Sequence, residues 1–393
     1  MSTPSPHVLI VGAGIAGLFL GILLERARIP YTIYERSDTV RPLGSVMSLN
    51  VNILPALEQV GLYEELLKFS FMTPGMHIYN EDMSKIQFIQ YKGFQEMVGY
   101  DYLVFSRPRF YDLLLSKIPP GRIQFNKRVL AIKHLAEGGV SIAFSDNTSQ
   151  IGDIVVGADG AYSGVRQSMY KSLEENGLLP QSDSQGLKIR YLTMFGTTDP
   201  LDDNEYQDLK DDFSHFRYYI GQGRPHTVQV STSSANDMAF RNTSWSSEGN
   251  ELMIKEIRDL PTIYGPVSRF IDATPQDRIS HVFMEEKMFE TWFHERTVLI
   301  GDAAHKMSPS QGQGAVNALQ DAVILANCLY EIANKASSEN ITAAFQSYKD
   351  QRYTRVKFQF KSSSFRAKLL FGQTMTSCML RQLILSYMSK SSM

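Results

Sequence analysis

The sequence is poor in cysteine, in long apolar runs and in excess charge of either sign. Its two cysteines, Cys328 and Cys378, lack metal-ligand spacing and form no disulfide framework, which favours a reducing compartment. A formal net charge of −2 provides no clustered basic field, so nucleic acid is excluded as a partner. No apolar stretch reaches the roughly 20 residues that span a bilayer, and residues 1–6 do not resemble a signal peptide. We therefore expect a cytoplasmic protein without a metal site.

The first forty residues have the pattern of a parallel β-α-β unit. Residues 7–11 form a short β-branched run that ends in glycine, residues 15–26 have helical spacing, and residues 31–34 form a second short run. Buried strands of the same type are predicted at 153–157 and 297–300. This alternation indicates an α/β fold with a parallel sheet covered by helices.

The middle of the chain follows a different pattern. From 187 to 279 short alternating runs are separated by turn residues, and residues 76–97 alternate in the same way, which predicts an inserted, mainly antiparallel β-sheet domain. The predicted domains are a discontinuous nucleotide-binding domain (1–75, 98–186 and 280–350), a substrate-binding sheet domain (76–97 and 187–279) and a C-terminal helical segment (351–393).

A dinucleotide fingerprint lies between the first predicted strand and helix. Gly12 permits a tight turn, Gly14 lets the backbone approach a pyrophosphate, and Gly17 lets the helix pack closely on the strand. The helix N-terminus then faces the phosphates. Glu35 ends the second strand, where a carboxylate accepts hydrogen bonds from ribose hydroxyls, and we place Arg36 in the same site. The motif alone fits FAD and NAD equally.

Two later segments resemble the motifs of one enzyme family, the group A flavoprotein monooxygenases. Residues 297–305, followed by Gln-Gly-Gln-Gly-Ala at 311–315, are similar to the second flavin fingerprint of this family. Residues 153–160 are similar to its DG motif, which implies that Asp159 holds structure on the pyrophosphate side of the site. The three motifs occur in the expected order, so the resemblance implies an FAD cofactor on a Rossmann-type domain.

Further residues are similar to fungal members of this family that act on terpenoid or polyketide intermediates, including the indole-diterpene epoxidases. The similarity lies in residues 44–52, in Arg107 and in Gly-Gln-Thr at 372–374. It implies that Arg107 lies beside the FAD. Ser48 stands where the family often has glycine and would make only a backbone contact.

The second fingerprint also implies the contacts to the flavin itself. Asp302 would hydrogen-bond the ribityl chain, although a turn-forming aspartate has the same local pattern. The helix that opens at Gly314 would face the flavin N1 and C2 oxygen, where a helix N-terminus stabilises the negative charge of reduced flavin. Ala315 is small enough for the ring system to lie against this turn.

The family resemblance also implies the chemistry. No second strand-glycine-helix fingerprint is present, so NADPH or NADH would bind transiently, reduce the flavin and leave. O2 would then form a flavin C4a-hydroperoxide, which oxygenates the substrate. Arg190 and Tyr218 are the candidate catalytic residues, with core packing as the alternative for both. Two other functions stay open, namely a flavin-dependent dehydrogenase or oxidase and an FAD-retaining scaffold without redox turnover.

The substrate is expected to be a hydrophobic small molecule. The segment 187–279 is rich in aromatic residues and has only His215 and His226 as potential bases for a phenol. Epoxidation of an alkene needs shape and exclusion of water rather than a base. This favours a terpenoid, meroterpenoid or polyketide intermediate, with hydroxylation as the other reaction.

The C-terminal tail has an apolar helical face within residues 376–388 and an excess of basic residues. Such a helix fits peripheral contact with an anionic membrane. It also fits docking of the apolar face on the protein itself, which we favour.

Overall fold

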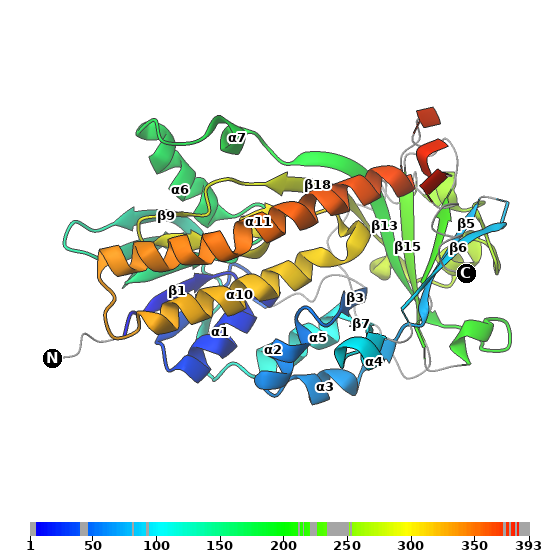
Figure 1. Cartoon of the computed structure of the whole chain (residues 1–393), viewed down its shortest axis with the longest axis horizontal. Coiled ribbons are helices and arrows are strands. Elements are labelled where there is room, and N and C mark those ends of the chain that lie inside the picture. The colour runs from blue at the N-terminus through cyan, green and yellow to red at the C-terminus, as the bar shows by residue number, and fades with distance from the viewer. Residues whose placement is uncertain are drawn as a thin grey trace. The chain divides into compact units, whose positions relative to one another are not determined.

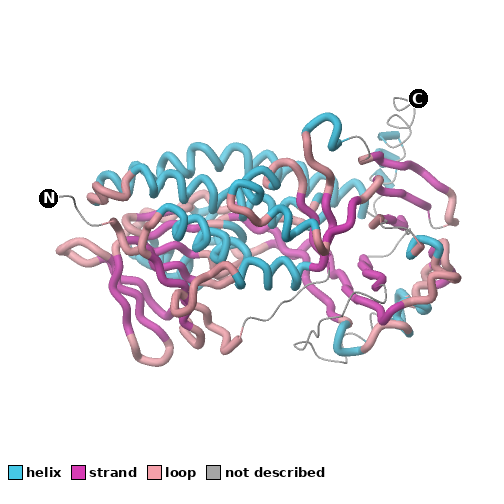
Figure 2. The backbone as a smooth tube through the Cα atoms, turned by 90° about the horizontal axis from the view of Figure 1, so that it is seen from below, coloured by secondary structure: helices cyan, strands magenta, loops and turns pink. Residues whose placement is uncertain are grey.

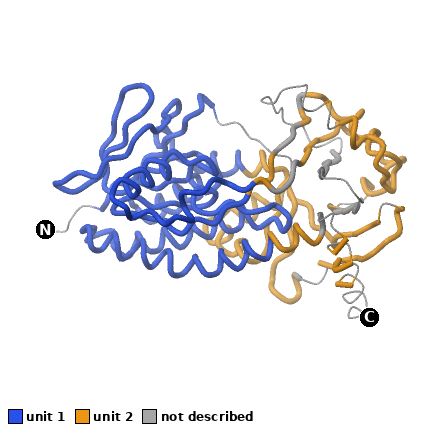
Figure 3. Tube along the Cα trace, turned by 90° about the horizontal axis from the view of Figure 1, so that it is seen from above, with its two compact units in different colours: residues 1–41, 111–188, 286–363 blue, residues 42–110, 189–285, 364–393 orange. Residues whose placement is uncertain are grey.

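The chain forms two compact units, which Figure 3 shows in different colours. Unit 1 consists of residues 1–41, 111–188 and 286–363. Unit 2 consists of residues 42–110, 189–285 and 364–393. These units reflect packing alone, and the boundaries of the functional domains stay a prediction. The computed structural model describes residues 5–39, 46–80, 82–91, 94–210, 213–214, 216–220, 226–233, 251, 254–371, 375–376, 379–381 and 383–384.

Unit 1 is built around a six-stranded sheet of order β19-β20-β12-β1-β2-β8, in which only the β19–β20 pair is antiparallel. The central strand β1 lies between β2, its successor in the chain, and β12. The carboxyl end of β1 is therefore a topological switch point, where open α/β sheets bind ligands. The strands are β1 Val8–Val11, β2 Tyr31–Tyr34, β8 Ile123–Gln124, β12 Ile154–Gly157, β19 Phe293–His294 and β20 Thr297–Leu299.

Burial explains why these segments form the centre of the unit. Every residue of β1 and β12 is buried, as expected for parallel strands covered on both faces. Helix α1 (Ile15–Ala27) is apolar on most of its circumference and packs against α10 (Gln313–Glu331), beside which it lies in Figure 1. The other elements assigned mainly to unit 1 are β9 Val129–His134, β10 Val140–Phe144, β11 Ser149–Gly152, α6 Gly164–Glu175, α7 Gln181–Ser184, β21 His305–Lys306 and α11 Ser338–Phe371.

Unit 2 contains smaller sheets and short helices, which Figure 2 distinguishes by colour. Its elements are β3 Val46–Leu49, α2 Leu54–Gln59, α3 Tyr63–Leu67, β4 Ser70–Met72, β5 Gly75–Asn80, β6 Lys85–Gln90, α4 Phe94–Val98, β7 Leu103–Ser106, α5 Arg107–Ser116 (continuing into unit 1), β13 Lys188–Pro200, β14 Phe216–Ile220, β15 His226–Ser233, β16 Pro261–Thr262, β17 Gly265–Pro266, α9 Ser268–Asp272 and most of β18 Ser280–Met288.

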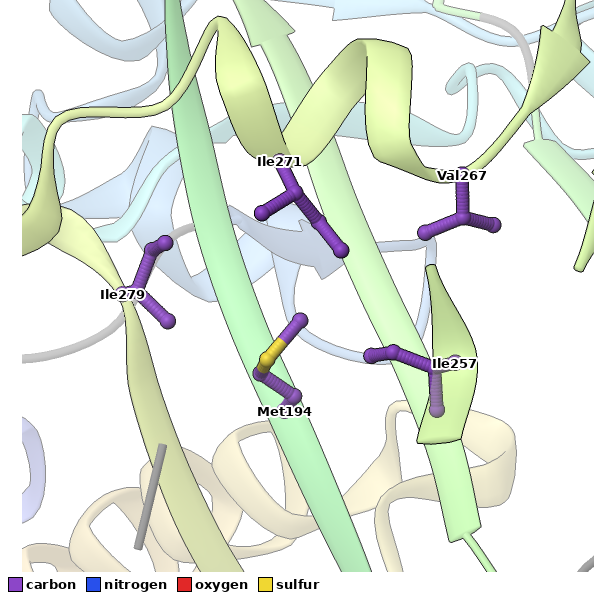
Figure 4. Close-up of a cluster of buried hydrophobic side chains, with 5 residues drawn as sticks. All are labelled: Met194, Ile257, Val267, Ile271 and Ile279. Carbon is purple, nitrogen blue, oxygen red and sulfur yellow. The ribbon is translucent and has the colours of Figure 1, made fainter. Parts of the chain in front are cut away.

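Unit 2 contains both parallel and antiparallel strand pairs. The pairs β5–β6, β3–β7 and β4–β7 are antiparallel, whereas β14–β5 and β13–β15 are parallel. One apolar cluster joins α9 to β13 and its neighbours, and Figure 4 shows its side chains pointing toward one another: Met194, Ile257, Val267, Ile271 and Ile279. The predicted fold class, a Rossmann-type α/β domain with an added sheet region, is confirmed.

Two segments, residues 52–69 and the tail, have local features that the sequence pattern does not specify. Residues 52–69 form the separate helices α2 and α3, because Gly61 adopts φ +74° and ends the first of them. In the tail, Arg381 is the buried residue at 5% exposure, while Met379 and Leu383 are 61% and 67% exposed. In the described part of the tail these apolar side chains are exposed, docking of the apolar face stays a prediction, and the remainder of residues 376–388 lies outside the described residues.

A buried ionic cluster ties α10 to α11. The Asp321 carboxylate is fully buried, lies 2.5 Å from His305 Nε2 and accepts hydrogen bonds from Gly301 N at 2.9 Å and Arg352 Nε at 2.7 Å. Burial alone would raise the pKa of Asp321, but the charges of His305 and Arg352 lower it below its usual value. Trp292 packs against His305. His305 is therefore a buried, packed residue of the second fingerprint.

Replacing Asp321 tests the cluster. Asp321→Asn leaves Arg352 buried without a counter-charge, so we expect the free energy of unfolding of the apoprotein to fall by about 3–5 kcal/mol. Because the pKa of Asp321 is lowered on folding, this contribution is present above the unfolded-state pKa and fades as the pH falls through the folded value. Urea unfolding at several pH values measures both effects. The control is Arg355→Gln on the exposed side of α11, and equal stability of the two variants would contradict the assignment.

Candidate functional site

The carboxyl end of β1 turns into α1 within a space that only glycine fits. Gly12 has φ +103°, and a Cβ there would lie 2.6 Å from the Ala158 carbonyl oxygen. A Cβ at Gly17 would lie 2.0 Å from the Gly12 carbonyl oxygen. Both are far inside van der Waals contact, so α1 begins directly against the ends of β1 and β12. The predicted roles of these glycines in turn formation and close packing fit this geometry.

Two side chains form hydrogen bonds to the glycine loop between β1 and α1. Glu35, at the end of β2, accepts hydrogen bonds from Ala13 N at 2.9 Å and from Ser37 N at 3.0 Å. Tyr111 donates from its hydroxyl to the Ala13 carbonyl at 2.6 Å, and burial raises the pKa of Tyr111, so the hydroxyl stays a donor. Arg36 follows Glu35 and is exposed. The Glu35 carboxylate thus lies at the glycine loop, and its contact with ribose hydroxyls stays a prediction.

The DG segment follows β12 at the same edge of the sheet. The Asp159 carboxylate accepts hydrogen bonds from Gly164 N at 2.7 Å and Val165 N at 3.2 Å, which caps α6. Its Oδ1 has no hydrogen-bond partner among the residues that the structure describes, and burial raises the pKa of Asp159. Arg166 donates to the carbonyls of Ala161 and Ala303. The segment is therefore braced against the turn after β20.

That turn, Gly301–Ala303, lies between the two central helices. A Cβ on Gly301 would lie 3.1 Å from the Ala318 Cβ of α10 and 3.5 Å from the Ala16 Cβ of α1. The next residue, Asp302, is one-third exposed and accepts a hydrogen bond from Lys306 Nζ at 2.6 Å. The close packing of small residues places this carboxylate beside the start of α1.

The N-termini of α1 and α10 leave room for a ligand. Within the described structure no side chain caps either helix, and Gly312 ends the preceding turn with φ +64°. A Cβ on Gly314 would meet nothing within 4 Å, and one on Gly14 would meet only the Ala158 carbonyl at 3.9 Å. The protein itself therefore has room for a side chain at both positions, and packing within the chain does not explain why they are glycine. Open space beside uncapped N–H groups fits an anionic nucleotide such as FAD, and the half-buried Ala315 adds little bulk.

The remaining predicted residues belong to unit 2. Ser48 lies in β3, 2.8 Å from the Tyr102 hydroxyl, and Arg107 is the exposed first residue of α5. Arg190 lies in β13 and Tyr218 in β14, which belong to different sheets. The side chains of Arg190 and Tyr218 lie outside the described residues, so their catalytic roles stay a prediction.

Sequence reasoning missed two residues that shape the site, Lys306 and Tyr111. Lys306 follows His305 in the second fingerprint, and its ion pair with Asp302 joins a 3-10 turn to a strand, where residue spacing gives no signal for an ion pair. Tyr111 carried no signal either, because its contact with Ala13 joins residues 98 positions apart.

The sequence matches the FAD binding domain family over residues 6–359, so the chain belongs to this family. Among curated relatives, the FAD-dependent monooxygenase ausM of Penicillium brasilianum is 28% identical, and the match covers 97% of this chain and 82% of the relative. The FAD-dependent monooxygenase atmM of Aspergillus flavus is 27% identical, with coverages of 98% and 82%.

Solved structures support the fold. HpxO of Klebsiella pneumoniae in complex with FAD and uric acid superposes with a TM-score of 0.70 at 19% identity, covering 96% of this chain and 92% of that one. CtdE in complex with FAD and a substrate gives a TM-score of 0.73 at 19% identity, with coverages of 93% and 90%. The predicted family, the FAD cofactor and the enzyme class of FAD-dependent monooxygenase are confirmed.

The two carboxylates of unit 1 give a test of the cofactor site. If Asp302 binds the ribityl chain as the second fingerprint implies, Asp302→Ala removes one or two charge-assisted hydrogen bonds to the flavin, and we expect FAD binding to weaken by roughly 2–4 kcal/mol. Glu35→Ala acts in the same direction at the adenosine end. Fluorescence titration of the apoprotein with FAD measures the dissociation constants.

Asp146→Ala is the matched control, because Asp146 also accepts a 2.6 Å contact from a lysine, Lys127, but in a turn between β10 and β11. It should bind FAD like the unmodified protein. Wild-type affinity in both Asp302→Ala and Glu35→Ala would show that the site lies elsewhere.

Proposed function

We propose that this FAD-dependent monooxygenase uses NADPH or NADH and O2 to epoxidise or hydroxylate a hydrophobic small molecule. The observation that carries the proposal is the opening at the starts of α1 and α10, where Gly14 and Gly314 leave space that the chain itself does not fill. Bound FAD, once reduced, supplies the electrons that activate O2. Relatives named FAD-dependent monooxygenases support this assignment.

In this proposal two loops of unit 1 bind different parts of the cofactor. The first loop and the N-terminus of α1 bind the pyrophosphate, while Glu35 and Arg36 serve the adenosine end. Asp302 binds the ribityl chain, and the N–H groups at the start of α10 stabilise negative charge on the reduced ring. The complete proposed set is Gly12, Gly14, Gly17, Glu35, Arg36, Ser48, Arg107, Asp159, Asp302, Gly314 and Ala315.

The substrate class is the finer part of the proposal. We assign a terpenoid, meroterpenoid or polyketide intermediate, because an apolar alkene needs shape and exclusion of water rather than a positioned base. Arg190 and Tyr218 are the proposed side chains on the substrate side. Peripheral membrane contact through the C-terminal helical segment would suit such a substrate, which partitions into lipid.

Isotope labelling tests the reaction. Purified protein is incubated with NADPH or NADH, a prenylated apolar substrate and ¹⁸O2, and product is analysed by mass spectrometry. We expect one labelled oxygen atom per product molecule and faster turnover, as kcat/KM, than with small water-soluble phenols.

Two results would replace the proposal. Substrate oxidation without label would indicate a dehydrogenase or oxidase. Absence of NAD(P)H oxidation across terpenoid, polyketide and phenolic panels, with FAD bound, would indicate a scaffold without redox turnover. A preference for small phenols would leave the monooxygenase and overturn the substrate class.

A further inference from the structure

The outer face of α11, the long orange-to-red helix of Figure 1, carries exposed aromatic side chains. Phe358 is 69% exposed and Phe365 is 54% exposed. They are seven residues apart, which is close to two helical turns, so they lie on one face. Lys361 and Lys368 follow each phenylalanine by three residues and therefore lie on the same face. We call these four residues the α11 outer face.

The opposite side of α11 is buried against the rest of the protein. Val356 and Ser363 are fully buried, and Ser310 Oγ donates to the Ser363 carbonyl at 2.7 Å. Tyr348, also fully buried, donates to the Leu299 carbonyl at 3.1 Å. The helix is thus held without its outer face, and folding does not account for two large aromatic side chains in contact with water.

The charge around this face has one sign. Residues 351–371 include six basic residues and no acidic one, and Arg352 alone is buried, in its pair with Asp321. Among the residues that the structure describes, none of the other five forms a salt bridge: Arg355, Lys357, Lys361, Arg366 and Lys368. The α11 outer face is therefore an apolar stripe within uncompensated positive charge.

We propose that the α11 outer face binds an anionic lipid bilayer, with the helix lying along the membrane surface. Phenylalanine rings enter the boundary between headgroups and acyl chains, while lysine stems lie along it and place their ammonium groups among lipid phosphates. A second copy of the chain is a poor occupant, because pairing this face with itself would bring like charges together. In the described residues, no helix has the length and hydropathy to cross a membrane.

The tail adds a second observation to the same end of the chain. Met375, Met379 and Leu383 are exposed by 83%, 61% and 67%. The buried Arg381 donates to the Leu369 carbonyl in the last turn of α11 at 3.3 Å. This hydrogen bond fastens the tail to α11 through its polar residue and leaves the apolar side chains free for lipid. The proposal rests on this surface and is independent of the substrate assignment.

Vesicle binding tests the proposal with the full-length, FAD-loaded protein. Sedimentation is measured with phosphatidylcholine vesicles and with vesicles in which roughly 30% is phosphatidylserine, at low and high salt. We expect binding to the anionic vesicles only, weakened at high salt. Phe358→Ser with Phe365→Ser, and separately Lys361→Gln with Lys368→Gln, should each reduce the partition coefficient by about tenfold.

The control removes one exposed apolar and one exposed basic residue elsewhere, by Leu178→Ser with Lys171→Gln, and should bind like the unmodified protein. FAD content and circular dichroism verify that each variant is folded. Failure of the unmodified protein to bind anionic vesicles, or binding by both α11 variants as strong as that of the unmodified protein, would overturn the proposal. A concentration-dependent dimer that the α11 variants abolish would assign the face to a second copy instead. None of these outcomes alters the labelling result for the proposed reaction.

Discussion

The structure of unit 1 depends on one steric constraint, the contact between the start of α1 and the end of β1. A Cβ on Gly17 would lie 2.0 Å from the Gly12 carbonyl oxygen, so the helix can begin at this point only with glycine. Gly301 extends the same principle, because it fits between Ala16 of α1 and Ala318 of α10. Close packing thus brings the starts of both helices to one edge of the parallel sheet. We propose that their uncapped N–H groups, together with Asp302, form the FAD site, which would then depend on this packing arrangement.

Much of this arrangement could be predicted, because it depends on short-range patterns. The run Val8–Val11, the glycine spacing and Glu35 specify a strand, a turn and a second strand within 35 residues, and the structure has each of them. The second fingerprint predicted a strand at 297–300 and a helix opening at Gly314, and the structure has β20 at Thr297–Leu299 and α10 from Gln313. Long-range partners were not predictable. Nothing near Asp321 in the sequence indicates Arg352, and nothing near Ala13 indicates Tyr111, because these contacts depend on how distant helices pack.

The sheet segments and the tail were less predictable for a different reason. Alternation of apolar and polar residues identifies a strand without identifying its neighbour, so the parallel pairing of β13 with β15 could not be read from it. In the tail, helical spacing identified an apolar face without indicating what covers it. Among the described tail residues, Arg381 is buried and Met379 is exposed, and docking of the tail stays a prediction. The membrane proposal for α11 rests on the exposed side chains of Phe358 and Phe365 and on the one-signed charge of residues 351–371.

The central claim is that the opening at the start of α10 is shaped for the cofactor, and the affinity of Gly314→Leu for FAD tests it most directly. The position has helical backbone and no neighbour within 4 Å of a Cβ, so the chain alone should tolerate leucine, as it should at the equally open and exposed Gly186. The account predicts that Gly314→Leu keeps the stability of the apoprotein and loses FAD affinity by tenfold or more, roughly 1.4 kcal/mol, while Gly186→Leu loses neither. Unchanged FAD affinity in Gly314→Leu would contradict the account.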